Sequence, residues 1–385
     1  MMNPMSRLLI FLLVLSILLL SGSYYLGTRL SILGNFSKFG KIFYWVMVFG
    51  ASLLIPALYF CYLFFTEFSG RSAFAFAAYT GFGFFTILLF FTVASDLGIF
   101  VSDKIFSTEI QSSRKEFFTR VFSLGASLLL TGYGILEVLK EVPVKKVTVK
   151  IPNLHPDLVG FRIVQMSDIH VGPTIHKDFT MMLRDKVNEL QADMVAITGD
   201  LVDGLVNDLR DHVAPLGEIQ SKHGTFFVTG NHEYYSGAIS WVKEIKRIGI
   251  QVLVNENILL KNKDAMLLLA GVPDHKGGNF YPEHEPDYRK AIENKSESDL
   301  KILLAHQPKQ VYGASDAGFD LQLSGHTHAG QYFPGTVLIH LAQKFVVGLK
   351  KYKNTILYVS PGTGYWGPPI RTFAPSEITL LVLDR

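Results

Sequence analysis

The sequence predicts an α/β protein in which two sheets pack face to face with helices outside them, preceded by a multi-span helical membrane region. Three observations predict this arrangement. The first third of the 385-residue chain carries long apolar runs without charge. Between residues 162 and 248, strand-like apolar runs alternate with segments of helical spacing, and toward the C-terminus the strand-like runs follow one another more closely. This pattern favours two packed sheets over a single doubly wound sheet.

Charge-free runs define a membrane region that we place at residues 1–140. Residues 8–28, 42–66 and 72–95 have no charged side chain, and each run is long enough to cross about 30 Å of hydrocarbon. A fourth helix is expected at 117–139, where the shorter charge-free part either spans the bilayer or lies at its surface. For 8–28 the alternative is a cleaved signal peptide, although the two runs that follow favour an uncleaved span. We therefore expect a multi-pass integral membrane protein.

Charge and cysteine content exclude several other classes of protein. Lys plus Arg number 36 and Asp plus Glu 33, a net charge of +3 without a dense basic tract, so nothing indicates a nucleic-acid partner. Basic residues flank the two sides of the expected spans equally, so the side that carries the catalytic domain stays open. Cys61 is the only cysteine and lies in an apolar run, which excludes disulfides and thiolate metal sites.

A catalytic domain is expected at residues 145–385. Pro143 ends the helical region, and residues 146–151 then alternate polar and apolar side chains as a strand with one wet face. Further strands are expected at 162–166, 194–197, 226–228, 266–271, 302–304, 321–323, 336–339, 355–359 and 377–383, and helices at 177–191, 209–219 and 239–248.

Five of the strand-like runs end in residue types that bind metal ions. These residues are Asp168, His170, Asp200, Asn231, His306, His326 and His328. Ligands bind beyond strand ends in such folds, so we expect the seven side chains to converge. Carboxylates, an amide and imidazoles suit Mn, Fe or Zn, and seven ligands are too many for one ion. Two ions sharing a carboxylate account for the number and predict hydrolysis of a phosphate ester by metal-activated hydroxide.

The order of these residues resembles the calcineurin-like metallophosphoesterase superfamily, whose pattern is D-x-H, G-D-x-x-D, G-N-H-[ED], a lone H and G-H-x-H. The matching stretches here are Asp168 to His170, Gly199 to Asp203, Gly230 to Glu233, His306, and Gly325 to His328. The resemblance covers about residues 145–385. It implies a four-layer α/β/β/α sandwich that binds two divalent or mixed-valence metal ions.

The resemblance also implies a role for each residue. The first metal would be held by Asp168, His170, Asp200 and His328, and the second by Asp200, Asn231, His306 and His326. His232 would contact the substrate and protonate the leaving oxygen, a task that suits an imidazole. Asp203 and Glu233 are expected to orient ligands or the loop backbone, with a solvated loop acid as the alternative for Glu233. Arg371 is expected either to hold a substrate phosphate or to pair with an acid in a structural role.

Gln331 and residues 362–371 resemble a membrane-anchored bacterial branch that includes hydrolases of UDP-diacylglucosamine. Ala329 stands where that branch usually has glycine. This resemblance implies a lipid-linked phosphate as substrate. Tyr365 and Trp366 are expected either to contact the substrate or to belong to the core. The alternative function is a non-catalytic membrane receptor or regulator that retains the fold. Such a protein would be expected to lose ligands, and none of the seven is replaced.

Overall fold

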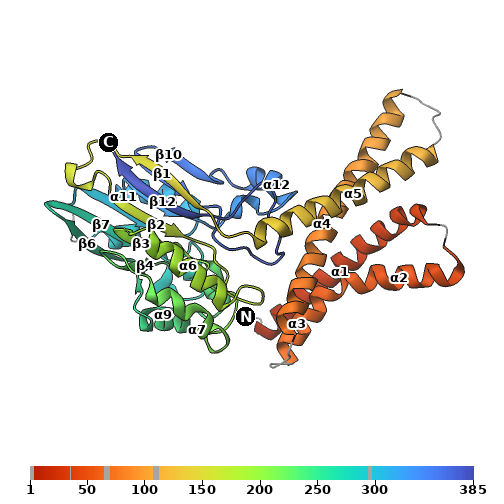
Figure 1. Ribbon diagram of the computed structural model, residues 1–385, viewed down its shortest axis with the longest axis horizontal. Helices are drawn as coiled ribbons and strands as arrows, with labels where there is room; N and C mark the ends of the chain where they lie inside the picture. The colour runs from red at the N-terminus through yellow and green to blue at the C-terminus, as the bar shows by residue number, and fades with distance from the viewer. Residues whose placement is uncertain (1–3, 35, 65–69, 107–111, 294–296) are drawn as a thin grey trace. The chain divides into compact units, whose positions relative to one another are not determined.

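The computed structural model describes residues 4–34, 36–64, 70–106, 112–293 and 297–385. The chain divides into two compact units. One comprises Met1–Glu137 with Gly367–Ile370, and the other comprises Val138–Trp366 with Arg371–Arg385. Figure 1 shows the first unit as helices and the second as two sheets with helices.

The helices of the first unit are long and apolar. They are α1 (Pro4–Leu30), α2 (Lys38–Ser52), α3 (Leu54–Phe64), α4 (Arg71–Phe106) and α5 (Ser112–Leu139). Among the described residues, three helices are long and apolar enough to cross a membrane: Ile10–Leu33, Arg71–Ile105 and Arg114–Leu139. The range 42–66 holds two helices with Leu53 between them, because Pro56 in the first turn of α3 lacks the amide hydrogen that a continuous helix needs. The number of spans and the domain boundaries remain predictions.

A charged cluster joins α1, α4 and α5. Asp96 of α4 accepts a hydrogen bond from Tyr25 and pairs with Arg29 of α1 and Arg120 of α5. Arg29 and Asp96 directly follow the charge-free runs 8–28 and 72–95, and Arg120 directly precedes another, although Asp96 and Arg120 lie within the candidate spans Arg71–Ile105 and Arg114–Leu139. Charges with partners at the ends of apolar stretches cost less than charges in the middle of a span.

The second unit contains two six-stranded sheets. The first has the order β1 (Val144–Lys150), β12 (Ile378–Asp384), β2 (Arg162–Met166), β3 (Met194–Ile197), β4 (Thr225–Phe227), β5 (Gln251–Val252). The second has the order β10 (Gly348–Tyr352), β11 (Thr355–Val359), β9 (Leu321–Ser324), β8 (Leu300–Leu304), β7 (Ala265–Gly271), β6 (Glu256–Asn262). Strands β2 to β5 are parallel to one another, as are β7, β8, β9 and β11.

The inner strands are mostly apolar because both of their faces are buried, whereas the edge strands β1 and β10 carry exposed lysines. In β2, Ile163 belongs to the core between the two sheets, whereas Val164 belongs to the core under the outer helices. Leu267 of β7 and Ile302 of β8 reach the same central core from the opposite sheet. Strands buried on two faces lose the polar alternation of a half-exposed strand.

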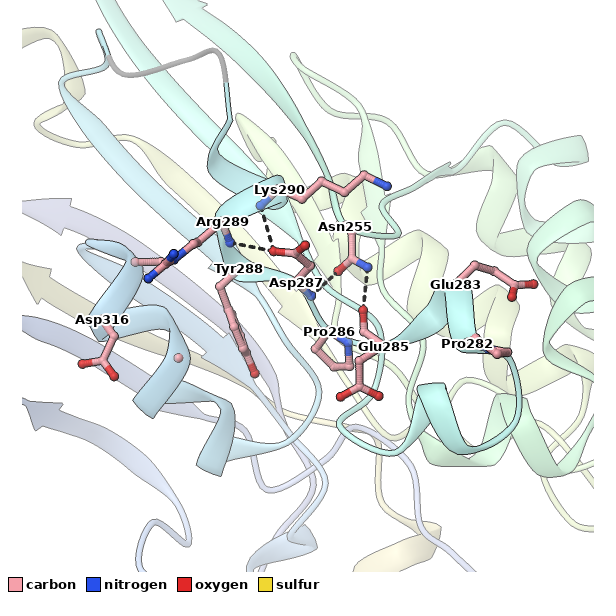
Figure 2. Close-up of a pocket in the computed structure, with 12 residues that line it drawn as sticks. Asn255, Pro282, Glu283, Glu285, Pro286, Asp287, Tyr288, Arg289, Lys290 and Asp316 are labelled. Atoms are coloured by element: carbon pink, nitrogen blue, oxygen red, sulfur yellow. Dashed lines mark hydrogen bonds between the residues drawn. The ribbon is translucent and has the colours of Figure 1, made fainter.

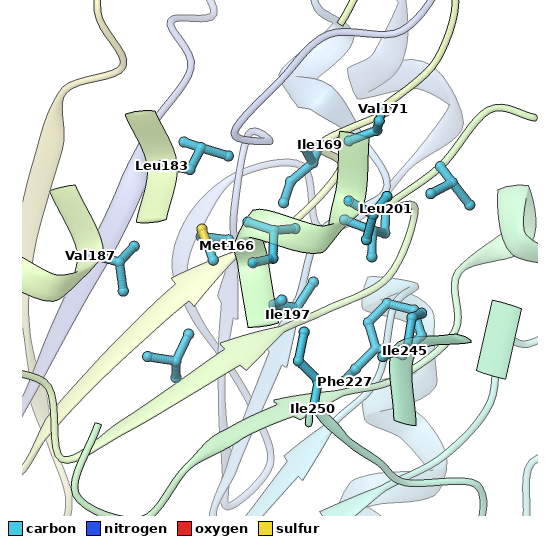
Figure 3. Packing of buried hydrophobic residues seen from close by; sticks show 14 of the residues in the cluster. Met166, Ile169, Val171, Leu183, Val187, Ile197, Leu201, Phe227, Ile245 and Ile250 are labelled. Carbon is cyan, nitrogen blue, oxygen red and sulfur yellow. The ribbon is translucent and has the colours of Figure 1, made fainter. Parts of the chain in front are cut away.

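Helices cover the outer face of each sheet. Those of the first sheet are α6 (Lys177–Glu189), α7 (Val206–Val213) and α9 (Ala238–Arg247), and those of the second are α10 (Tyr288–Ile292) and α11 (Val311–Ala317). Figure 3 shows part of the core under the first layer, with Leu183 and Val187 of α6 and strand residues Met166 and Ile197. Ala291 of α10 packs in the corresponding core of the second sheet. The predicted fold of two packed sheets with outer helices is confirmed.

One predicted strand is wrong. Residues 336–339 lie in the helix α12 (Gly335–Ala342), not in a sheet. Pro334 precedes the helix, and its fixed φ suits a helix start. A run of four apolar residues does not by itself distinguish strand from helix.

Candidate metal centre

The seven predicted ligands all follow the carboxyl ends of strands. Asp168 and His170 follow β2, Asp200 follows β3, and Asn231 follows β4, while His306 follows β8 and the pair His326 and His328 follows β9. Strands β2, β3 and β4 are parallel neighbours in one sheet, and β8 and β9 are parallel neighbours in the other. The carboxyl ends of parallel strands share one edge of a sheet, so these segments can meet.

Three groups of side chains are close enough to hold a metal ion. One consists of His170, Asp203 and His232, and the other two contain predicted ligands only. The ligand atoms of Asp168, His170 and His328 lie within 4.8 Å of one another, as do those of Asp200, His306 and His326. In the first group, His170 Nε2 is 3.0 Å from His328 Nε2. In the second group, His306 Nε2 is 3.0 Å from Asp200 Oδ2 and 3.2 Å from His326 Nδ1.

Asp200 lies between the two groups. Its Oδ2 atom is 3.0 Å from His306 Nε2 in its own group and 4.0 Å from His170 Nε2 in the other. Its Oδ1 atom accepts a hydrogen bond of 2.8 Å from the backbone N–H of His232. A carboxylate in this position can contribute to both groups.

The donor set fits metal ions. Asn231 Oδ1 is a buried side-chain oxygen without a hydrogen-bond partner, and an unsatisfied buried oxygen is costly unless something binds it. Burial, with His306 nearby, lowers the pKa of His326 to about 3, and burial lowers the pKa of His328 to about 4. Both imidazoles are therefore neutral at pH 7, the form that binds a metal.

The two ligand carboxylates are held in the charged form. Burial alone would raise the pKa of both carboxyls, but His328 beside Asp168 and His306 beside Asp200 hold them well below the usual value. The neutral imidazoles of His326 and His328 and the charged carboxylates of Asp168 and Asp200 belong to the set that Mn, Fe and Zn accept, whereas the charges of Asp200 and Asp168 raise the pKa of His306 despite its burial.

Asp203 connects two histidines. Its Oδ2 atom is 3.0 Å from His170 Nδ1, and its Oδ1 atom accepts from His232 Nδ1. Each histidine uses Nδ1 for this bond, so Nε2 is the nitrogen that remains for a ligand or substrate. Asp203 therefore fixes the ring orientation of His170 and His232, and its role in orienting a metal ligand stays a prediction.

His232 lies beside the metal ligands and is partly accessible. Its side chain is 14% exposed, and its Nε2 atom is 4.0 Å from Asp200 Oδ2. Burial lowers the pKa of His232, but the charges of Asp200 and Asp203 raise it to about 9. The imidazole is therefore protonated at neutral pH and is able to act as an acid.

The backbone around the site is unusual. Five of the seven predicted ligands have φ between +49° and +72°: Asp168, His170, Asp200, His326 and His328. Non-glycine residues rarely adopt this region, and it concentrates at functional sites. At Gly325, a Cβ would lie 2.1 Å from Asp168 Oδ2, so the loop approaches the ligand as closely as glycine allows.

Glu233 organises the loop after β3. It is fully buried, and its carboxylate accepts hydrogen bonds from the backbone N–H groups of Gly230, Asp200, Leu201 and Val202. The alternative of a solvated loop acid is therefore wrong. Burial, with the charge of Asp200, raises the pKa of Glu233 to about 7.

Replacing Glu233 with glutamine is expected to destabilise the two-sheet unit by about 3 kcal/mol, because an amide NH₂ would face backbone donors that lose their acceptor. Denaturant unfolding of the full chain, followed by a probe in this unit, measures the change. Glu218→Gln is the matched control, since that side chain is 65% exposed and its pair with Arg184 contributes less than about 1 kcal/mol. Equal destabilisation by the two substitutions would contradict the assigned role.

Arg371 is buried beside the first ligand group. Its guanidinium donates to the carbonyl oxygens of Gly364, Ala374 and Pro361, and its Nη2 atom is 3.3 Å from His328 Nδ1. These partners are carbonyls, whereas the predicted structural role was a pair with an acid. Burial lowers the pKa of Arg371 to about 10, so the side chain stays charged at neutral pH. Contact of Arg371 with a substrate phosphate remains a prediction.

Two polar contacts were missed by sequence reasoning. Gln331 and Trp366 exchange hydrogen bonds between the amide side chain and the Trp366 backbone, at 2.9 and 3.0 Å. Asp274 lies three residues after β7, is fully buried, and accepts from Gln307, the neighbour of His306. The sequence pattern that could have identified Asp274 is the apolar run 266–271, a sixth strand-like run that is followed by a carboxylate.

Exposed aromatic rings flank His232. The rings of Trp366 and Tyr235 each lie 5.4 Å from the His232 ring, and Phe280 lies 6.0 Å from Tyr235. Trp366 is 54% exposed, whereas Tyr365 is buried in the core. The side of the site next to His232 therefore offers apolar rings to a bound molecule.

A separate surface pocket lies around the start of α10 and has a structural explanation. Figure 2 shows Asp287, whose carboxylate caps α10 by accepting from the N–H groups of Arg289 and Lys290. Asn255 accepts from Asp287 N–H and donates to the Glu285 carbonyl. The side chains of Asp287 and Asn255 are thus engaged in holding the local backbone.

Comparisons with known proteins agree with this geometry. A family model described as calcineurin-like phosphoesterase matches residues 161–330. An uncharacterized metallophosphoesterase of Helicobacter pylori is 40% identical over 279 residues, 70% of this chain and 72% of that protein. One of Campylobacter jejuni is 44% identical over 262 residues, 67% of each chain. A bovine (Bos taurus) protein named transmembrane protein with metallophosphoesterase domain is 38% identical over 286 residues, 71% of this chain and 64% of that protein.

The matched family segment begins at the start of β2 and ends directly after the paired histidines, so it includes every strand end that carries a predicted ligand. The chain therefore belongs to the calcineurin-like metallophosphoesterase family.

Proposed function

We propose that the protein is a membrane-bound phosphoesterase that holds two metal ions and hydrolyses a phosphate ester or pyrophosphate of a lipid-linked substrate. The observation that carries the proposal is the pair of ligand groups with Asp200 between them. The first ion would be held by Asp168, His170, Asp200 and His328, and the second by Asp200, Asn231, His306 and His326. Two such ions, Mn, Fe or Zn, activate a water molecule and neutralise charge on the phosphoryl oxygens.

The residues around the ions have separate tasks. His232 presents Nε2 to the leaving oxygen and donates a proton to it, while Asp203 holds the other ring nitrogen. Glu233 fixes the loop that carries Asp200. Trp366 and Tyr235 provide the apolar side of the site on which the leaving group rests.

Membrane attachment supports the lipid-linked substrate. Within the described residues, three helices are long and apolar enough to span, and relatives from Bos taurus and Danio rerio are named transmembrane proteins. A hydrolase anchored in a bilayer meets substrates that are anchored there as well. The catalytic domain would be held next to them by its own chain.

Metal removal tests the proposal. The purified full chain is expected to carry about two ions and to hydrolyse a nitrophenyl phosphodiester, and chelation is expected to lower turnover by more than about 100-fold. Adding back Mn²⁺, Fe²⁺ or Zn²⁺ should restore it, measured as turnover against metal content. A chain that loads two ions and hydrolyses neither soluble nor lipid-linked phosphate esters would refute the proposed function.

A further inference from the structure

The helix α12 of the two-sheet unit exposes apolar side chains. All eight of its residues, Gly335–Ala342, are described, and none of them is buried. Val337, Leu338 and Leu341 are 59%, 49% and 86% exposed. Positions three and four apart lie on one face of a helix, so these three side chains form a single apolar face. A helix of a soluble domain normally turns such a face to the core.

α12 is attached to the metal centre. The backbones of Gly330 and Gly335 approach so closely that a Cβ on either would lie within 2.4 Å of the other's carbonyl oxygen. Gly330 ends the turn that starts at His328. Gln331, the next residue, binds the Trp366 backbone, and the Trp366 ring touches His232. The apolar face is therefore presented by the segment that builds one side of the site.

The chain segment that contains α12 carries side-chain charges of one sign, although Lys353 pairs with Asp316 of α11. Residues 331–360 contain Lys344, Lys350, Lys351 and Lys353 and no acidic residue. Lys344, two residues beyond α12, places its Nζ 5.7 Å from the ring centre of Tyr352 on the edge strand β10. Lys350 and Lys351 are exposed on the same strand. α12 itself has no lysine, but an exposed apolar helix face with exposed lysines in the segment that follows it favours the surface of an anionic bilayer.

One of the helices able to span a membrane leads directly into the two-sheet unit. α5, one of the three helices able to span, ends at Leu139, and β1 of the two-sheet unit begins at Val144. The five intervening peptide steps reach at most about 18 Å. The two-sheet unit therefore begins close to the end of a membrane helix. Lipid is for this reason the partner that we expect at the apolar face of α12.

We propose that α12 inserts Val337, Leu338 and Leu341 into the surface of an anionic bilayer, with Lys344, Lys350 and Lys351 at the level of the headgroups. The insertion turns the Trp366 side of the metal centre toward the membrane surface, where the phosphate of a lipid-linked substrate lies. The insertion is independent of catalysis, whereas this consequence for substrate choice rests on the proposed function.

Fluorescence of the full chain in vesicles of phosphatidylcholine and phosphatidylglycerol tests the insertion. In a Cys61→Ala background, Leu341→Cys carries an environment-sensitive label, and nitroxide-labelled lipids act as quenchers. Val159→Cys is the matched control, because Val159 is 45% exposed and precedes β2, at the edge of the sheet opposite to the metal centre. We expect a blue-shifted, lipid-quenched label at 341 and a water-exposed label at 159. Water-exposed labels at both positions, or disulfide cross-links at 341 between two copies, would overturn the insertion.

Turnover tests the consequence for substrate choice. Leu341→Asp is expected to lower hydrolysis of a lipid-linked phosphodiester in vesicles by about tenfold or more, and to leave hydrolysis of a soluble nitrophenyl phosphodiester unchanged. Val159→Asp should affect neither substrate. An equal loss on both substrates would overturn the assigned role in substrate choice. If the wild type hydrolyses neither substrate, the proposed function and the consequence for substrate choice fail together, while the fluorescence still decides the insertion.

Discussion

Replacing Asp200 with asparagine is expected to lower the metal content from about two ions to one or none and to reduce turnover by about 1,000-fold or more. Asp200 Oδ2 is 3.0 Å from His306 Nε2 and 4.0 Å from His170 Nε2, so it serves both ligand groups. Asparagine keeps an oxygen that can accept from the His232 backbone, but it lacks the second oxygen and the negative charge. Metal analysis of the purified full chain and turnover on a nitrophenyl phosphodiester measure the two effects together.

Asp208→Asn is the matched control for this experiment. Asp208 lies in the first turn of α7 and is exposed, so the same change of charge occurs away from the site. It is expected to leave both metal content and turnover unchanged. If Asp200→Asn retained two ions and full turnover, Asp200 would not lie between the metals and the assignment of ligands would have to be abandoned.

The His232→Ala variant is expected to retain both metal ions and to lose turnover. The loss is expected to be larger for a leaving group that must be protonated than for one that leaves as a stable anion. His232 lies outside the two groups to which we assign the ions, and in its own group with His170 and Asp203 its Nδ1 is engaged with Asp203. For an alkyl phosphate ester, loss of a general acid lowers turnover by about 100-fold to 10,000-fold. For a nitrophenyl ester, whose leaving oxygen is stable as an anion, we expect a much smaller loss.

The comparison of the two leaving groups distinguishes acid catalysis from a structural defect. A collapsed site would lower both rates equally, and it would also release metal. His212→Ala on α7 serves as the control for removing an imidazole, since His212 accepts a hydrogen bond from Lys177 N–H away from the ligand groups. Equal losses on the two esters by His232→Ala would disprove the role as proton donor.

The sequence predicted the positions of most strands better than it predicted the order of the strands in the sheets. Each predicted ligand lies two to four residues after the end of a strand, and that placement follows from sequence alone. In contrast, β12, the last strand of the chain, lies between β1 and β2 and runs antiparallel to β2. The apolar sequence of β12 indicates that the strand is buried on both faces, but this sequence does not indicate which strands are its neighbours in the sheet.

Several roles depended on burial, which spacing does not reveal. The sequence allowed Glu233 either to orient the backbone or to be a solvated acid, and only the position of the loop after β3 decides between them. Asp274 lies three residues after β7, the same distance as Asp200 after β3, but it belongs to none of the motifs that marked the other acids. Residues 336–339 were assigned to a strand from β-branched and apolar residue types, which a short exposed helix also tolerates.

The left-handed backbone at five ligands has a consequence for the order of assembly. The strand ends, the close approach at Gly325 and the four bonds of Glu233 hold these conformations through the polypeptide itself. The energetic cost of these backbone conformations is therefore offset when the sheets form. Metal binding does not have to offset it. Synthesis and metallation are therefore separable events. The chain should fold first and accept its ions afterwards, so a cell short of one metal could load another into a finished protein.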